Sequence, residues 1–337
     1  MNSADLGAPG ERVSGANEKA CAASTMTELN FSRANSMSRR EFVRVALGAG
    51  TFVLTGEFAM ADSSIRKPIP KTGESLLAVG LGTWQTFDVG AGQSSREPLK
   101  EVLREFVRLG GSVIDSSPMY GKSESVVGDL ATELGVRKHL FLATKVWTSG
   151  REAGIRQMDE SFKRLRTQHM DLMQVHNLED YRTQLATLRH WKEQGKVRYI
   201  GVTHYTASAH DELARVLTSE NPDFVQINYS IVEREAERRL LPLAAEKRVA
   251  VLANRPLAAG GLFSRVRGKS LPPWSSEIGC TSWAQFFLKF VISHPAVTCA
   301  IPATSKVEHL IDNMRAAVGP LPDAATRERM ARHLTEL

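Results

Sequence analysis

Cysteine is scarce in this sequence, with three residues in 337. Cys21, Cys280 and Cys299 form no Cys-x-x-Cys pair and stand in no histidine-rich cluster, so we expect no metal site. If the first part of the chain is removed in an oxidising compartment, a single disulfide could still join Cys280 and Cys299. Two buried thiols are the favoured interpretation.

Three further features are missing, and each excludes a class of protein. No apolar run approaches the roughly 20 residues that cross a bilayer, so we expect no stable membrane span. No Gly-x-Gly-x-x-Gly motif follows a strand pattern, which argues against the open dinucleotide-binding fold. The net charge of +6 is not gathered into a basic stripe with interleaved aromatic residues, so nucleic-acid binding is not expected. The positive charge could instead favour an anionic ligand such as a phosphate-bearing cofactor.

Residues 1–61 carry the features of a disordered leader that ends in an export signal. An arginine pair stands in Ser38-Arg39-Arg40-Glu41-Phe42, a weakly apolar stretch follows at Val45–Leu54, and Ala59-Met60-Ala61 has the form of a signal-peptidase site. This order resembles a twin-arginine (Tat) signal. We therefore expect the Tat export machinery as a partner, cleavage near Ala61, and a periplasmic protein that is cytoplasmic before export. The alternative is a chance arginine pair before a surface helix.

Residues 62–337 show short apolar runs that alternate with amphipathic stretches, which is typical of a parallel sheet with crossover helices. Eight such runs predict an α/β fold of the (β/α)8 TIM-barrel type rather than an open sheet. A short hairpin is expected at Ile65–Leu76, before the barrel, and a final helix at Asp323–Thr335. The predicted strands are Leu77–Leu81, Ser112–Asp115, Leu140–Lys145, Met170–His176, Val197–Val202, Phe224–Tyr229, Val249–Ala253 and Val297–Ile301.

Three predicted strands end in polar residues, and barrels of this type hold their active sites at the carboxyl ends of the strands. Asp115, Lys145 and His176 end neighbouring runs, and Tyr120 lies in the loop after Asp115. Carbonyl reduction needs a proton on oxygen, and a phenol beside an ammonium group can supply one, because the ammonium lowers the phenol's pKa. A carboxylate would keep the buried lysine charged, and the imidazole could orient the substrate oxygen. Each residue alone could be structural, as a cap, a surface lysine, a hydrogen-bonded histidine or a loop anchor.

Six motifs in sequence order resemble the aldo-keto reductase family over about residues 65–320. They are Gly80-Leu81-Gly82-Thr83-Trp84, Asp115-Ser-Ser-Pro-Met-Tyr120-Gly121, Ala143-Thr144-Lys145-Val146, Gln174-Val175-His176-Asn177, Gln226-Ile227-Asn228-Tyr229 and Ile301-Pro302-Ala303-Thr304-Ser305-Lys306. The resemblance implies an oxidoreductase that reduces a small-molecule aldehyde or ketone, with Tyr120 as proton donor supported by Asp115, Lys145 and His176. It also implies a bound nicotinamide dinucleotide, NADP(H) or NAD(H).

The resemblance further assigns residues to the cofactor and to the substrate. A helix that opens at Thr304–Lys306 would bind phosphate through free amides and its dipole, with ordinary capping as the alternative. Trp84 and Trp147 flank the rim and could line a substrate pocket or simply pack there, and Gly260–Gly279 is a candidate loop over the cofactor. The cofactor-binding candidates are Thr203, His204, Gln226, Arg255, Pro256, Leu257, Thr304, Ser305, Lys306, His309 and Asn313.

Departures from the family pattern leave the preference for NADP(H) over NAD(H) open. Thr203-His204 stands where many members carry Ser-Asn, and Asn254-Arg255 removes the aromatic residue expected to stack on nicotinamide. Arg255 could stack in its place or reach the pyrophosphate. A cofactor-binding sensor or accessory subunit of the same fold with little turnover is the alternative function, because fold alone does not fix function. A Schiff-base lyase with Lys145 as nucleophile would need a neutral amine.

Overall fold

A computed structural model describes residues 64–337 of the chain, and the leader and its signal motif lie outside these residues. Eight strands form one sheet in which every neighbouring pair is parallel and the spatial order follows the chain. The amides of Gly80 and Gly82 donate to the carbonyls of Ala300 and Pro302, so the first and last strands also meet and the sheet closes into a barrel. The strands are β3 (Leu81–Gly82), β4 (Val113–Asp115), β5 (Phe141–Val146), β6 (Met170–His176), β7 (Val197–His204), β8 (Phe224–Asn228), β9 (Ala250–Asn254) and β10 (Val297–Ala300).

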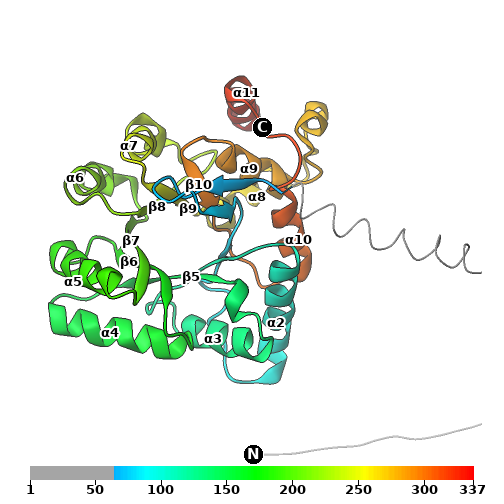
Figure 1. Ribbon diagram of the computed structural model, residues 1–337. Helices are drawn as coiled ribbons and strands as arrows, with labels where there is room; N and C mark the ends of the chain where they lie inside the picture. The colour runs from blue at the N-terminus through cyan, green and yellow to red at the C-terminus, as the bar shows by residue number, and fades with distance from the viewer. Residues whose placement is uncertain (1–63) are drawn as a thin grey trace, which may run out of the picture. The chain divides into compact units, whose positions relative to one another are not determined.

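Helices surround the strands, as Figure 1 shows. Helix α2 illustrates how they pack by burying Leu99, Val102, Leu103 and Phe106 at helical spacing. No helix within residues 64–337 is long and apolar enough to cross a membrane. The helices are α2 (Gln93–Arg108), α3 (Ser123–Glu133), α4 (Arg151–Arg164), α5 (Tyr181–Glu193), α6 (His210–Glu220), α7 (Leu240–Glu246), α8 (Gly261–Arg265), α9 (Trp283–Ile292), α10 (Val307–Arg315) and α11 (Ala324–Glu336).

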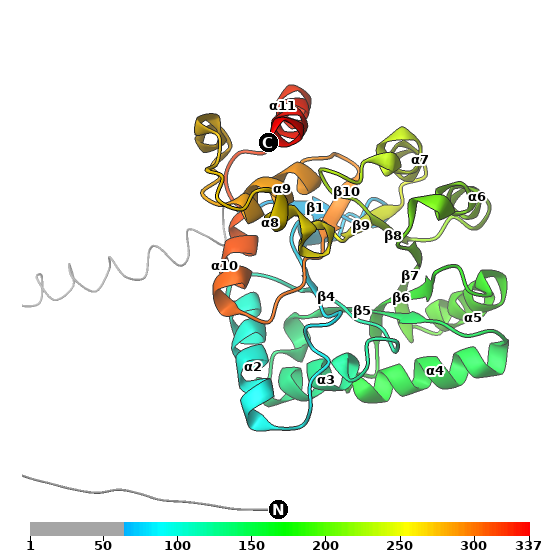
Figure 2. The same ribbon diagram turned by 180° about the vertical axis from the view of Figure 1, so that it is seen from behind.

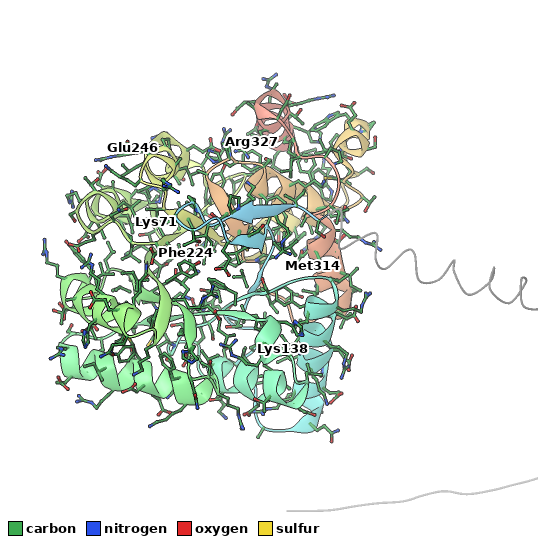
Figure 3. The ribbon with its side chains drawn as sticks, viewed as in Figure 1. Lys71, Lys138, Phe224, Glu246, Met314 and Arg327 are labelled. Carbon is green, nitrogen blue, oxygen red and sulfur yellow. The ribbon has the colours of Figure 1, made fainter. Side chains whose placement is uncertain are left out.

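An antiparallel hairpin of β1 (Arg66–Pro68) and β2 (Ser75–Leu77) covers the amino-terminal end of the barrel. Its turn is tied to that end because Lys71 Nζ donates to the carbonyl of Pro222, just before β8, at 2.8 Å, and Arg248, just before β9, donates to the carbonyl of Pro70. Beneath it the interior is filled by an apolar cluster that includes Phe224, labelled in Figure 3. The opposite, carboxyl-terminal end of the strands is the one seen in Figure 2.

The predicted barrel, hairpin and final helix are confirmed, with strand limits within a residue or two except at the first strand. The prediction of that strand at Leu77–Leu81 was wrong in extent, because Leu77 pairs with Arg66 of β1, and the segment meets the barrel strands from Val79 to Gly82. A 3₁₀ helix at Glu235–Arg238 precedes α7 and does not continue into it, since Pro242 lacks the N–H that a continuous helix would donate to Arg238. Cys280 and Cys299 are buried free thiols, as favoured.

Helices α3 and α4 pack closely at Gly128, which predicts a stability defect in the Gly128→Ala variant. A Cβ atom at this position would collide with the backbone carbonyl of Arg164, which cannot easily move. Overpacking of this kind costs about 1–3 kcal/mol, so we expect a lower urea midpoint with an unchanged slope. The control is Gly90→Ala, whose methyl group would meet nothing within 4 Å. Equal midpoints for the two variants would contradict the close packing.

Candidate active site

The four residues predicted from the strand ends lie together at the carboxyl-terminal rim. Lys145 Nζ donates to Asp115 Oδ2 and to the carbonyl of Ser116, each at 2.7 Å, and lies 4.9 Å from the centre of the Tyr120 ring. The Tyr120 ring meets the His176 ring edge-on at 6.1 Å between centroids. Adjacent parallel strands place Asp115 on β4, Lys145 on β5 and His176 on β6 at one edge.

Lys145 is an ammonium group held in place by a carboxylate. Its side chain is fully buried, and Asp115 is 4% exposed. Burial alone would lower the pKa of Lys145, but the Asp115 carboxylate and the Tyr120 phenol more than compensate, so its pKa is raised. A Schiff-base nucleophile needs a neutral amine, and this pairing opposes that state, which removes the basis for the lyase hypothesis.

The pKa of Tyr120 is raised rather than lowered, which corrects the sequence-based expectation for the free protein. Burial of the phenol raises its pKa and outweighs the opposing effect of Lys145, while Asp115 adds to the rise. Lys145 does lower the pKa of the phenol, as expected, but burial raises that pKa by more. In this state Tyr120 holds its proton at neutral pH, as a proton donor must.

His176 is neutral at the rim. Burial, with the charges of Lys145 and His204, lowers the pKa of His176 to about 3. Its ring also lies 6.2 Å from that of Trp147. A neutral imidazole donates from one nitrogen only, so the tautomer decides what His176 can do.

Two polar residues at the site were not among the predicted site residues. Gln174 Nε2 donates to Asp115 Oδ1 at 3.3 Å and so orients the carboxylate that holds Lys145. Ser117 Oγ lies 3.2 Å from His176 Nδ1. Gln174 could have been found from the alternation of side chains along a strand, because it lies two residues before His176 and therefore on the same face of the sheet. No pattern in the sequence pairs Ser117 with His176, because the contact joins different strand ends.

Aromatic side chains are exposed around the same rim. Trp84, in the loop after β3, is 48% exposed and Trp147, directly after β5, is 39% exposed. Met119 and Tyr205, in the loops after β4 and β7, are also exposed there. The structure thus places both predicted tryptophans at the mouth, with part of each ring free to contact a bound molecule.

Thr203 on β7 and Gln226 on β8 form a polar pair across neighbouring strands. Thr203 Oγ1 donates to Gln226 Oε1 at 3.1 Å, and Gln226 Nε2 is buried with no hydrogen-bond partner among residues 64–337. Buried donors are rarely left unpaired, so this amide fits a ligand that brings a carbonyl oxygen. The neighbouring His204 uses Nδ1 to accept the amide proton of Thr206 at 3.2 Å.

The predicted phosphate-binding segment lies before α10 rather than inside its first turn. The helix begins at Val307, and Thr304 Oγ1 accepts the Lys306 amide proton at 3.1 Å. Ser305, Lys306 and His309 are exposed, whereas Asn313 is buried on α10. Ala303 bridges to Gly82, so the segment lies on the rim beside the loop that carries Trp84.

Arg255 lies on the loop after β9, with Pro256 and Leu257. Its φ is +52°, and its Nε is 4.0 Å from Glu233 Oε2. The side chain is 39% exposed, and within residues 64–337 one weak ion pair holds it, so a bound anion could compete for it. The predicted loop at residues 260–279 forms α8 and a 3₁₀ helix at Pro273–Ile278, and its place over a cofactor stays a prediction.

Comparisons with known proteins place this architecture among reductases. The aldo/keto reductase family model matches residues 78–329. Methylglyoxal reductase YeaE of Escherichia coli is 32% identical over 256 residues, covering 74% of this chain and 88% of the relative, and an NADH-specific methylglyoxal reductase of the same organism is 28% identical, covering 61% and 71%. A Klebsiella pneumoniae aldo/keto reductase solved with NADP and acetate superposes with a TM-score of 0.64 at 26% identity, covering 78% of this chain and 93% of that one.

Proposed function

The chain is a member of the aldo/keto reductase family, and from this membership we propose that it reduces an aldehyde or ketone to an alcohol with NADP(H). The observation that carries the proposal is the buried ammonium of Lys145, held by Asp115 and facing the ring of Tyr120. A buried ammonium group beside a phenol favours loss of the phenolic proton, because the cation stabilises the phenolate that forms.

Several residues act on the carbonyl oxygen of the substrate, each in a different way. When bound, the nicotinamide dinucleotide supplies a hydride to the carbonyl carbon. Tyr120 gives its proton to the carbonyl oxygen, and Lys145 stabilises the phenolate that remains. His176, being neutral, can donate a hydrogen bond to the same oxygen and orient it. Gln174 and Asp115 keep Lys145 charged and in place.

The cofactor is assigned to the polar residues on the rim. The unpaired amide of Gln226 suits the carboxamide oxygen of nicotinamide, with Thr203 and His204 beside it. Arg255, on the loop with Pro256 and Leu257, would approach the pyrophosphate, and the exposed Ser305, Lys306 and His309 would approach the adenosine phosphate, with Asn313 nearest the adenine. The NADP complex of the Klebsiella relative supports NADP(H), while the NADH-specific relative makes NAD(H) the alternative to test.

Turnover and binding must be measured side by side to test this function. The purified protein would be titrated with NADPH by fluorescence, and NADPH oxidation would be followed with aldehydes, ketones and quinones, beginning with methylglyoxal because two relatives bear that name. We expect tight binding and steady-state turnover with at least one carbonyl. Binding without turnover on any of them would favour the sensor or accessory subunit and move the search to a partner protein.

Lys306 is expected to set the preference for NADPH over NADH. A charged hydrogen bond to phosphate contributes about 1.5–3 kcal/mol, so Lys306→Ala should weaken NADPH binding roughly 10- to 100-fold and leave NADH binding unchanged. The control is Lys138→Ala, an exposed lysine before β5 at the other end of the barrel (Figure 3). Equal losses for NADPH and NADH would show that Lys306 does not contact the 2′-phosphate.

We also propose that residues 1–61 direct export through the Tat pathway to the periplasm, on the strength of Ser38-Arg39-Arg40-Glu41-Phe42 and the apolar stretch after it. Fusion of these residues to a reporter, compared with an Arg39→Lys, Arg40→Lys double variant, tests the proposal. Periplasmic reporter that depends on the arginine pair is expected. Equal export of both fusions, or no export of either fusion, would contradict a Tat signal in these residues.

A further inference from the structure

A hydroxyl group lies against the inner nitrogen of the rim histidine. Ser117 is fully buried, and its Oγ is 3.2 Å from His176 Nδ1. The same Oγ accepts the amide proton of Met119 at 3.2 Å, a local turn that fixes the serine side chain. The contact joins the loop after β4 to the end of β6.

The direction of the Ser117–His176 hydrogen bond follows from counting protons. The Met119 amide already donates to Oγ, so the hydroxyl's own proton needs an acceptor. Among residues 64–337, His176 Nδ1 is the acceptor in contact with it. If Nδ1 carried a proton instead, two donors would face Oγ and the hydroxyl proton would be buried unpaired, which is unfavourable. Nδ1 is therefore the acceptor.

We propose that Ser117 is a positioning residue that holds neutral His176 with its proton on Nε2, directed at the carbonyl oxygen of the substrate. The part that concerns the substrate rests on the proposed function, and the tautomer does not. Lys145 and His204 are the titratable groups whose charges act on His176, and with burial they keep the ring uncharged. With no charge on the ring, one proton is shared by two nitrogens, so the neighbour of one nitrogen decides what the other can donate.

The tautomer can be read directly by nitrogen NMR of the protein labelled with ¹⁵N-histidine, with His176 assigned from the signals lost in His176→Gln. At pH 7 we expect an unprotonated Nδ1 and a protonated Nε2. Ser117→Ala should shift these signals toward a mixture of tautomers, lower kcat/KM about tenfold and leave NADPH affinity unchanged. Ser117→Thr keeps the hydroxyl and should restore both readouts in part.

A buried serine away from the rim serves as the matched control. Ser161→Ala, near the end of α4 that leads toward the start of β6, should leave the His176 signals and kcat/KM as in the parent protein. A proton on Nδ1 in the parent protein, or unchanged His176 signals in Ser117→Ala, would overturn the proposal. If no carbonyl is turned over, the proposed function fails while the NMR result still decides the tautomer.

Discussion

Replacement of Tyr120 by Phe is expected to lower kcat/KM for carbonyl reduction by at least about two orders of magnitude, since general acid catalysis contributes roughly 10²–10⁴-fold. The variant keeps the ring that meets His176 and lies beside Lys145, and it loses only the phenolic proton. NADPH affinity should therefore be preserved. Steady-state kinetics and a fluorescence titration on the same preparation separate the two effects.

Tyr181→Phe is the matched control for this experiment. Tyr181 begins α5 and contacts the guanidinium of Arg182, outside the residues assigned to chemistry. Its variant should keep the parent rate. A Tyr120→Phe protein that retains a rate within threefold of the parent would show that another group donates the proton.

Lys145→Met should remove both activity and stability, for two different reasons. Activity should fall by about two orders of magnitude or more, because Tyr120 loses the cation that favours its phenolate. Stability should fall by about 3–5 kcal/mol, because the change leaves the buried Asp115 carboxylate without its partner. Urea unfolding and steady-state kinetics measure the two losses.

Adding Asp115→Asn to Lys145→Met separates these losses. Asparagine is neutral and can still accept the hydrogen bond that Gln174 donates to Oδ1, so much of the stability should return. The activity should not return, because the phenol still lacks a cation. Recovery of activity together with stability would mean that Lys145 serves the fold rather than the reaction.

The rim could be predicted from sequence because its main residues end predicted strands, and the carboxyl ends of parallel strands meet. That rule alone was enough to place Asp115, Lys145 and His176 together. Tyr120 could be added because it lies in the loop between β4 and α3. Ser117 was not assigned to the site because its partner lies across the rim, so no local spacing reports the contact.

Other differences arise where two effects compete. The direction of the Tyr120 pKa shift depends on the balance of burial against the Lys145 charge, and the degree of burial is not readable from a motif. Leu77 was predicted to begin the first barrel strand, but it pairs with Arg66 of β1 instead.

The covered amino-terminal end of the barrel has a consequence for the return of the proton. On that side the β1–β2 hairpin covers the barrel, and the apolar cluster around Phe224 fills its interior. In the proposed reaction Tyr120 gives up its proton, and the exposed mouth beside Trp84 and Trp147 is the side from which solvent would replace it. Product and cofactor would fill that mouth. Tyr120 should therefore be reprotonated only after the alcohol has left the site, and the next reaction cycle would wait for product release.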